Sequence, residues 1–321
     1  MPDFKARQKR LLVLIEGAGL RSVLVSGMKD IFYYSGYKTA GAFLLMGGGE
    51  AKLFTRILCT EAPARPGASV RLYKKLEEVA AQLKGSVGTD YTMPAATLLR
   101  LRRLAKCRLS DATKLIKEPR SVKETDELEK MRKAIRLTRK VFAATDPWGR
   151  TERDVAAGME MAFLQKGARR AFPIIVASGS NAFYIHHIPT ATKVTGGPVI
   201  MDAGARVEGY CADMTRTLTK GQEQRRLLEE AKAMQAEILD FIEPGMKMAA
   251  VQKFWESLMR RKGYKVMHAF GHGIGLDVHE RVETIKVGTV LAVEPGIYMH
   301  GAGGWRVEDI AAVKKSGAKI L

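Results

Sequence analysis

The stretch Pro198-Val-Ile-Met-Asp-Ala-Gly turns around Glu208-Gly209 and returns as Tyr210-Cys-Ala-Asp-Met-Thr-Arg-Thr-Leu. Two β-rich runs on either side of a Gly-containing turn predict a β-hairpin. The hairpin carries one carboxylate on each strand, Asp202 and Asp213.

A second stretch follows the same plan near the C-terminus. Val290-Leu-Ala-Val-Glu-Pro-Gly-Ile-Tyr turns through Gly301-Ala-Gly-Gly and returns as Trp305-Arg-Val-Glu-Asp-Ile-Ala-Ala-Val. It again carries one carboxylate on each strand, Glu294 and Glu308. The two hairpins indicate an approximate internal duplication.

These four carboxylates stand in apolar surroundings, as in Val199-Ile-Met-Asp. Removing a carboxylate from water costs several kcal/mol unless it is paired or bound to a cation. Salt bridges to Arg206, Arg216 and Arg306 are one solution, and bound metal ions are another.

A glycine-flanked histidine in Phe270-Gly-His-Gly-Ile-Gly favours the metal. On a short strand, glycine neighbours leave the His272 ring unobstructed, as a ligand requires. Four carboxylates and one imidazole exceed the three protein ligands of an open catalytic zinc, and they suit two divalent ions bridged by carboxylates and by water or hydroxide. The expected chemistry is metal-assisted hydrolysis.

Composition excludes several other classes of protein. The 321 residues are 46% hydrophobic and 27% charged, which is near ordinary globular usage, and the length predicts about two domains. The formal net charge of +19 is unusual and reflects a low content of acids. The apolar run from Leu11 ends at Glu16, too short for a signal-peptide core or a membrane span. The cysteines, Cys59, Cys107 and Cys211, form no disulfide or zinc pattern, so we expect a cytoplasmic protein without a membrane partner.

Charge and histidine content divide the chain. Residues 1–120 hold 22 Lys and Arg against 10 Asp and Glu, and all six histidines lie later. The linker is predicted at Lys117-Glu-Pro-Arg, because Pro119 blocks helix propagation. We therefore expect an α/β N-terminal domain over residues 1–118 and a catalytic domain over residues 119–321.

Periodicity predicts the main elements. Ser121 and Glu124 are expected to form a capping box before a helix that runs to about Thr145. The other expected helices cover residues 7–20, 72–83, 95–104, 152–166, 222–242 and 249–262, and the expected N-terminal strands cover residues 22–26, 31–34, 43–46 and 52–54.

The motifs resemble those of the pita-bread metallopeptidases (the M24-type creatinase/aminopeptidase family), specifically the proline peptidases: Xaa-Pro dipeptidase, or prolidase, and Xaa-Pro aminopeptidase. The resemblance rests on Asp202-Ala-Gly, Asp213-Met-Thr-Arg-Thr, Gly271-His-Gly-Ile-Gly, Val278-His-Glu, Glu294-Pro-Gly-Ile-Tyr and Arg306-Val-Glu-Asp, in the family's order and spacing. Asp30-Ile-Phe-Tyr-Tyr-Ser-Gly-Tyr is similar to a run in creatinase-type N-terminal domains. The resemblance thus covers nearly the whole chain and implies a small α/β N-terminal domain before a pita-bread α+β domain with pseudo-two-fold hairpins.

The resemblance also implies roles for single residues. Glu294 would move a proton to the leaving nitrogen, and His279 would stabilise the oxyanion. The metal ligands would be Asp202, Asp213, His272, Glu294 and Glu308, with Asp213 and Glu308 bridging two ions of Mn, Co or Zn.

The remaining positions are implied substrate contacts. His186 and His268 match pocket histidines, although a hydrogen-bonded core histidine is an alternative for His268. Arg306 would bind a substrate carboxylate or brace Glu308. His187 and His300 match no role and are expected on the surface or in loops.

The chain departs from the family pattern around the expected substrate entrance. Ile185 and Ile188 stand where a proline and a polar residue are frequent, and the segment after Glu280 is short and lacks proline.

The expected function is hydrolysis of the Xaa-Pro bond of dipeptides by a metal-bridging hydroxide. The alternatives are an Xaa-Pro aminopeptidase acting on longer peptides and, more remotely, a non-catalytic basic scaffold of the same fold. The Arg306-Val-Glu-Asp motif argues against a methionine aminopeptidase, and the five ligands argue against a creatinase-like hydrolase. The expected partners are a proline-containing peptide and a second copy in a homodimer, with no specific nucleic acid.

Overall fold

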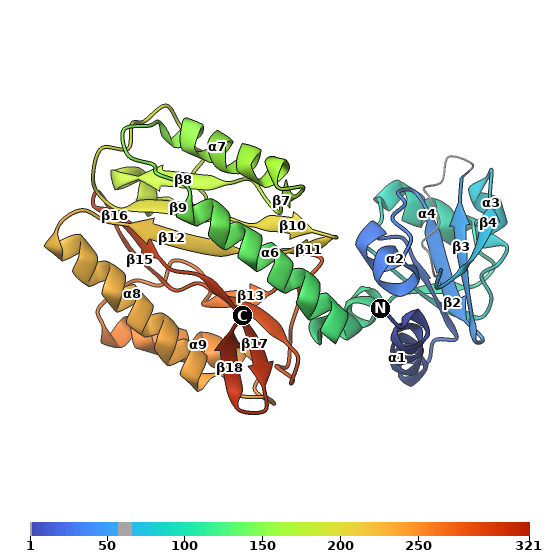
Figure 1. Cartoon of the computed structure of the whole chain (residues 1–321). Coiled ribbons are helices and arrows are strands. Elements are labelled where there is room, and N and C mark those ends of the chain that lie inside the picture. The colour runs from blue at the N-terminus through green and yellow to red at the C-terminus, as the bar shows by residue number, and fades with distance from the viewer. Residues whose placement is uncertain (1, 57–65) are drawn as a thin grey trace. The chain divides into compact units, whose positions relative to one another are not determined.

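The computed structural model describes residues 2–56 and 66–321 (Figure 1). They form two compact units, residues 1–120 and 121–321. Cys107 and Cys211 are free thiols, and Cys59 lies outside the described residues. Within the described ranges, no helix is both long and apolar enough to cross a membrane.

The first unit is built on one mixed six-stranded sheet. Its strand order is β4-β3-β2-β1-β5-β6, and β1 pairs antiparallel with β2 and parallel with β5. The strands are β1 (Ser22–Val25), β2 (Phe43–Gly47), β3 (Glu50–Thr55), β4 (Ser69–Leu72), β5 (Ser86–Thr89) and β6 (Arg108–Asp111).

Five helices accompany this sheet. They are α1 (Phe4–Gly17), α2 (Met28–Ser35), α3 (Leu76–Ala80), α4 (Ala95–Leu104) and α5 (Thr113–Lys117). Leu24 and Val87 on the central strands are fully buried and share a core with Val79 of α3 and Leu101 of α4. The α/β architecture expected for this part of the chain is therefore present.

The predicted strand over residues 31–34 was wrong, because this segment lies in α2. Ile31, Tyr33 and Tyr34 are all fully buried, so the helix shows no polar face from which a helical period could be read. The hydroxyls of Tyr33 and Tyr34 donate to the carbonyl oxygens of Pro119 and Ile116 at 3.0 and 2.6 Å. The segment is thus fixed by partners more than 80 residues away.

The second unit begins with α6 (Thr125–Ala143), which follows the 3-10 turn η1 (Glu118–Ser121). Its capping box pairs Glu124 with Glu127, not Ser121 with Glu124 as predicted. Residues Val122 and Lys123 are held outside the helix by pairing with the chain around Thr289, so the helix starts later than the sequence pattern indicated.

Three further helices and twelve strands complete the described part of this unit. The helices are α7 (Glu152–Gln165), α8 (Gln222–Phe241) and α9 (Met248–Arg261), each within one residue of its predicted bounds, and η2 (Gly179–Phe183) is a 3-10 turn. The strands are β7 (Arg169–Arg170), β8 (Ile175–Ser178), β9 (Val199–Ala203), β10 (Ala205–Val207), β11 (Tyr210–Cys211), β12 (Met214–Leu218), β13 (Gly271–Gly273), β14 (Val290–Val293), β15 (Gly296–Met299), β16 (Gly303–Arg306), β17 (Asp309–Lys314) and β18 (Gly317–Ile320).

Both predicted hairpins are present. In the first, β9 pairs antiparallel with β12 in the sheet β12-β9-β8. In the second, β14 pairs with β17 and β15 pairs with β16. Figure 1 shows α6 and α7 near the strands of the first hairpin, and α8 and α9 near those of the second.

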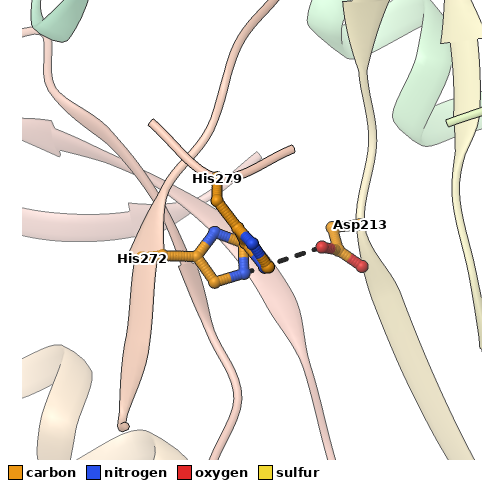
Figure 2. A group of neighbouring side chains, drawn as sticks. All are labelled: Asp213, His272 and His279. Atoms are coloured by element: carbon orange, nitrogen blue, oxygen red, sulfur yellow. Dashed lines mark ion pairs between the residues drawn. The ribbon is translucent and has the colours of Figure 1, made fainter. Parts of the chain in front are cut away.

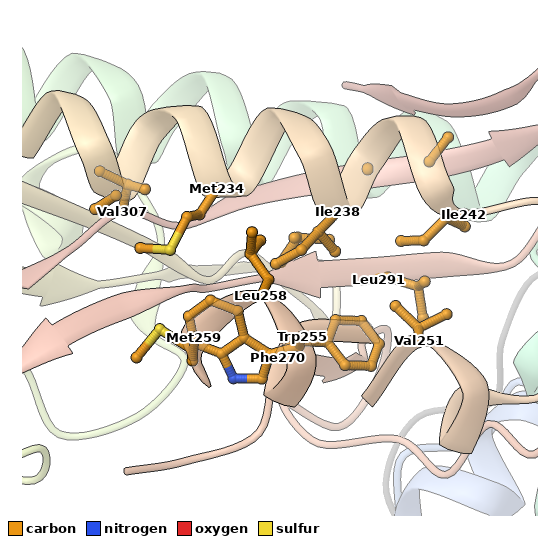
Figure 3. Packing of buried hydrophobic residues seen from close by; sticks show 14 of the residues in the cluster. Met234, Ile238, Ile242, Val251, Trp255, Leu258, Met259, Phe270, Leu291 and Val307 are labelled. Carbon is orange, nitrogen blue, oxygen red and sulfur yellow. The ribbon is translucent and has the colours of Figure 1, made fainter. Parts of the chain in front are cut away.

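Helices α8 and α9 pack their apolar faces over the second hairpin (Figure 3). Ile238 of α8 and Trp255 of α9 lie over Leu291 of β14, and all three are almost fully buried. Burying an aliphatic or aromatic side chain of this size contributes about 1.5–3 kcal/mol. This core holds β13 and β14 in place, and these two strands lead into the site.

Candidate metal centre and active site

The five predicted metal ligands converge on one place in the second unit. Three groups of side chains each have ligand atoms within 4.8 Å of one another. The groups are Asp202, Asp213 and Glu308; His272, Glu294 and Glu308; and Asp213, His272 and His279, the last of which Figure 2 shows. Every predicted ligand occurs in at least one group.

The first hairpin positions two of these carboxylates. Asp202 on β9 lies opposite Thr215 on β12, and Asp213 immediately precedes β12. The chain before Asp213 passes so close to Gly204 that an added Cβ would lie 1.8 Å from the carbonyl oxygen of Ala212. Glycine in the Asp202-Ala-Gly motif is therefore required by this close approach.

The short strand β13 presents His272 from between two glycines. A Cβ at Gly271 would lie 2.0 Å from the carbonyl oxygen of Ala292 on β14. Glu294, directly after β14, donates its backbone N–H to the carbonyl oxygen of Phe270 at 2.8 Å. The His272 Nε2 atom then lies 3.5 Å from Glu294 Oε1 and 3.7 Å from Asp213 Oδ2.

Hydrogen bonds through Thr215 join the two hairpins. The backbone N–H of Glu308 donates to the Thr215 carbonyl at 3.2 Å, and the Thr215 hydroxyl donates to Glu308 Oε2 at 2.9 Å. The same hydroxyl accepts from Nε of Arg306 at 3.0 Å. Glu308 is thus held from its backbone and from its side chain.

The three arginines do not neutralise the four carboxylates as a set. Arg216 pairs with Asp309, and Arg206 donates to backbone carbonyl oxygens. Buried Arg306 pairs with Asp202, with Nη2 at 2.8 Å from Oδ2. Among the described residues, this is the only ion pair between an arginine and one of the four carboxylates. Salt bridges alone therefore do not explain the cluster. Arg306 contacts Asp202, whereas the sequence had suggested Glu308.

The carboxylates are short of positive charge. Burial, and then the charges of Glu308 and Asp202, raise the pKa of Asp213 well above its ordinary value. Burial raises the pKa of Glu308 well above its ordinary value too, and the charges of Glu294 and Asp202 add to the rise. Burial also raises the pKa of Asp202 in spite of Arg306, and its buried Oδ1 has no hydrogen-bond partner among the described residues. Divalent cations would supply the missing charge and the missing partner, so the donor set fits them.

A cavity of about 950 Å³ opens beside the carboxylates. Its wall is largely apolar and includes Ile185 and Ile188, the two positions that depart from the family pattern. The predicted substrate residues His186, His268, His279 and Arg306 all line it. An apolar cavity with a few converging polar groups is typical of a small-ligand site.

The cavity histidines differ in their surroundings. His268 Nε2 lies 2.9 Å from the hydroxyl of Tyr298, and burial lowers the His268 pKa to about 4. Burial also lowers the pKa of His279, whose ring stands edge-on to His272 at a centroid distance of 4.1 Å. His268 and His279 are therefore neutral at pH 7.

Two further histidines matched no role in the sequence. His300 is exposed, as expected, against the ring of Phe183. His187 lies in the loop that follows η2, as expected, but it is not at the surface: its side chain is 11% exposed, and Nε2 lies 2.8 Å from Glu152 Oε2.

Sequence reasoning missed the hydrogen-bonding roles of Thr215 and Tyr298. Thr215 stands two residues after Asp213, and Tyr298 accepts a hydrogen bond from Arg306 Nη1 at 2.9 Å. Strand alternation places residues two apart on the same face, which was the available signal for Thr215 beside Asp213.

Comparison with known proteins gives the same assignment. Residues 129–315 match the model of metallopeptidase family M24, and residues 7–122 match the creatinase/prolidase N-terminal domain. The Xaa-Pro dipeptidase of Pyrococcus horikoshii is 30% identical over 100% of this chain and 98% of its own. That of Pyrococcus furiosus is 29% identical over 99% of this chain and 97% of its own.

Solved structures confirm the predicted pita-bread fold. The prolidase from Pyrococcus horikoshii superimposes with a TM-score of 0.90 at 26% identity, covering 98% of this chain and 97% of its own. The X-Pro aminopeptidase from Thermotoga maritima gives a TM-score of 0.85 at 27% identity, covering 98% and 96%. The chain belongs to metallopeptidase family M24, a family of metal-dependent hydrolases, and carries a creatinase/prolidase N-terminal domain before its metallopeptidase domain.

Proposed function

We propose that this protein is an Xaa-Pro dipeptidase that hydrolyses the peptide bond before proline with two bound divalent ions. The observation that carries the proposal is the convergence of five ligand residues beside a largely apolar cavity whose lining includes the three predicted substrate histidines, His186, His268 and His279. Full-length similarity to two archaeal Xaa-Pro dipeptidases supports the substrate class.

Asp202, Asp213, His272, Glu294 and Glu308 would hold the metal ions. Asp213, His272 and Glu308 each occur in two of the three ligand groups, and of these three the carboxylates of Asp213 and Glu308 would be shared between the ions, as the family resemblance implies. Bound divalent cations supply the Lewis acidity that activates water and polarises a carbonyl.

The side chains themselves account for binding and proton transfer. Glu294 lines the cavity, and its carboxylate would accept a proton from the attacking water and deliver it to the prolyl nitrogen. In the metal-free protein, burial raises the pKa of this carboxyl to about 7. Neutral His279 can donate a hydrogen bond to an oxyanion. His186 and His268 would contact the substrate, and the apolar wall of the cavity excludes water.

Two roles were expected for Arg306: binding a carboxylate of the substrate, or bracing a neighbouring acid. Its guanidinium donates to Asp202, Thr215 and Tyr298, which favours a bracing role that fixes Asp202. Because Arg306 also lines the cavity, contact with a substrate carboxylate remains part of the proposal.

An Xaa-Pro aminopeptidase is the second candidate, because the Thermotoga maritima structure is almost as similar as the prolidase structures. To separate the two, the purified protein is stripped with chelator, loaded singly with Mn, Co or Zn, and given an Xaa-Pro dipeptide, a longer Xaa-Pro peptide and a Met-Ala peptide. Metal-dependent cleavage of the dipeptide alone supports the proposal, and preference for the longer peptide supports the second candidate. Cleavage of neither proline substrate would refute both.

We also propose a cytoplasmic homodimer, which the family resemblance implies. The mass of one chain is 35.4 kDa. Light scattering coupled to size-exclusion chromatography should give twice this mass. A monomer at micromolar concentration would contradict the dimer, and recovery in a membrane or secreted fraction would contradict the location.

A further inference from the structure

A buried carboxylate outside the metal cluster organises one wall of the cavity. Glu152 is the first residue of α7, and its side chain is 0% exposed. Oε1 accepts hydrogen bonds from the backbone N–H and hydroxyl of Ser178 and from Asn181 Nδ2, at 2.8–3.0 Å. Oε2 lies 2.8 Å from His187 Nε2 and accepts from the backbone N–H and hydroxyl of Thr190.

These donors belong to one continuous segment, residues 178–190, which contains η2 and the chain that follows it. The first turn of α7 holds the end of this segment a second time, because the backbone N–H groups of Glu152 and Arg153 donate to the carbonyl oxygens of Thr192 and Thr190 at 3.0 Å. A single carboxylate thus closes a surface loop whose ends are Ser178 and Thr190.

The closed loop carries the predicted substrate residue His186. Both histidines line the cavity, but His187 turns its Nε2 atom to buried Glu152, whereas His186 is exposed. On the other side of His186, the carbonyl oxygen of Ile185 accepts a hydrogen bond from Arg306 Nη1 at 3.4 Å. His186 therefore stands between two neighbours that are both fixed to buried charged groups.

The charge state of Glu152 sets the direction of these hydrogen bonds. Burial tends to raise its pKa, but the hydrogen bonds from Asn181, His187 and Thr190 outweigh burial and hold the pKa at about 2. An ionised carboxylate only accepts hydrogen bonds, so His187 must donate from Nε2. The orientation of the His187 ring is thereby fixed.

We propose that Glu152 and His187 form a positioning pair that holds His186 against the substrate in the cavity. His187 is the anchor and His186 is the contacting residue, so two adjacent histidines divide the two tasks. The inference rests on the proposed function of the cavity as a peptide site. A displacement of about 1 Å in a positioned group is enough to cost on the order of a hundredfold in rate.

A double-mutant cycle tests this division. His187→Phe keeps the ring but removes the donor, and it should lower kcat/KM about 10- to 100-fold, mainly by raising KM. His187→Gln keeps a donor and should restore most of the loss. In a His186→Ala background, His187→Phe should have no further effect, because its action passes through His186. If the losses in kcat/KM of the two single variants multiply in the double variant, the two residues act independently and the proposal is overturned. Wild-type kinetics in His187→Phe would also overturn it.

Matched controls and a readout without substrate complete the test. His300→Ala changes an exposed histidine beside Phe183, and Glu160→Gln changes a half-buried carboxylate on α7 that pairs with Arg170. Both variants should leave KM unchanged. Amide hydrogen exchange should quicken in residues 178–190 of His187→Phe and Glu152→Gln, with α8 and α9 unaffected, and unchanged exchange there would overturn the anchor. If the wild-type protein cleaves no Xaa-Pro peptide, the proposed function fails, while the exchange experiment still decides whether the anchor exists.

Discussion

Glu294 shows how the surroundings of one residue set its chemistry. Burial is the main cause that raises its pKa to about 7, the charge of Arg306 acts in the opposite direction, and the charge of Asp202 adds to the rise. A carboxylate in solution has a pKa near 4 and would be a poor proton donor at pH 7. The position of Glu294 at the end of β14, beside three other acids, therefore favours a bound proton at this carboxyl as long as no cation is present.

We predict that Glu294→Gln will lower kcat about 100- to 10,000-fold, the usual contribution of a positioned acid or base. The amide oxygen can still act as a ligand, but the side chain can no longer carry a proton. Kinetics and metal content are measured on the same preparation. The exposed Glu243→Gln is the control, and a Glu294→Gln enzyme with full kcat would exclude the proton-transfer role.

Lys123 and Glu280 form an ion pair that is almost closed to solvent, with side chains 1% and 6% exposed and Nζ 2.8 Å from Oε2. Lys123→Met leaves the Glu280 charge buried without its cation, which should lower the free energy of unfolding by about 3–5 kcal/mol. Denaturant unfolding measures the loss.

The control for this pair is Lys232→Met, whose partner Glu229 is 67% exposed. It should cost at most about 1 kcal/mol. Equal losses in the two variants would mean that burial does not determine the contribution of the Lys123 pair.

At the residue scale, the sequence indicated the side chains that cluster at the proposed metal site but not their hydrogen-bond partners. Asp202, Asp213, His272, Glu294 and Glu308 stood out because acids in apolar strands and a histidine between glycines are unusual in any context. Glu152 did not stand out, because an acid in the first turn of a helix is ordinary. Its role depends on a loop that ends 38 residues later, at Thr190, and no local pattern reveals that contact.

At the scale of elements, the site depends on strands that lie unusually close. Gly271→Ala would place a Cβ 2.0 Å from the Ala292 carbonyl oxygen, which must separate β13 from β14 and move His272. We predict at least about a tenfold loss of metal affinity, corresponding to about 1.4 kcal/mol, with little change in circular dichroism. Titration calorimetry measures the affinity.

Gly196→Ala is the matched control, because a Cβ there meets nothing within 4 Å and the residue needs no left-handed conformation. It should bind metal like the wild type. Unchanged affinity in Gly271→Ala would show that the tight contact between the strands does not position the ligand.

Helices α8 and α9, which have one polar face, were predictable, whereas helix α2, which lacks one, was not. The faces of α8 and α9 alternate clearly between solvent and core, and their bounds were predicted within one residue. In contrast, α2 buries Ile31, Tyr33 and Tyr34 together and was mistaken for a strand. The cap of α6 shifted from Ser121 to Glu124 because the preceding residues pair with a distant strand segment, and such pairing leaves no local signature.

At the scale of the whole molecule, a strongly basic chain contains a locally acidic site. The net charge is +19, yet Asp202, Asp213 and Glu308 lie within one ligand group. Burial raises the pKa of all three, and neighbouring acids add to the rise for Asp213 and Glu308. Without cations, the folded protein therefore holds protons there that the unfolded chain releases. Metal and protons compete for the same oxygen atoms, which links metal affinity, stability and pH.

This linkage predicts that the stability of the chelated protein depends on pH and that bound metal removes the dependence. The pKa of Glu294 is about 7 in the folded state against an ordinary 4.5, so the folded state binds more protons between these values. Stability of the chelated protein should then fall as pH rises from about 4.5 to 7, and a pKa rise of this size is worth about 3 kcal/mol. Loaded protein should escape the fall, because cations replace the protons. At a metal concentration of about 100 times Kd, the gain is about 2.7 kcal/mol, or roughly 5–10 °C in Tm.

Thermal scans of both forms between pH 5 and 8 test this prediction, with the double variant Asp213→Asn and Glu308→Gln as control. The difference in Tm should be small near pH 5 and grow toward pH 8. In the double variant, metal should no longer raise Tm, and Tm should depend much less on pH. The variant removes two of the carboxylates for which metal and protons compete, and it retains side chains of the same shape. Parallel curves for chelated and loaded wild-type protein would mean that the raised carboxylate pKa values are not relieved by metal, and that the cluster is not the metal site.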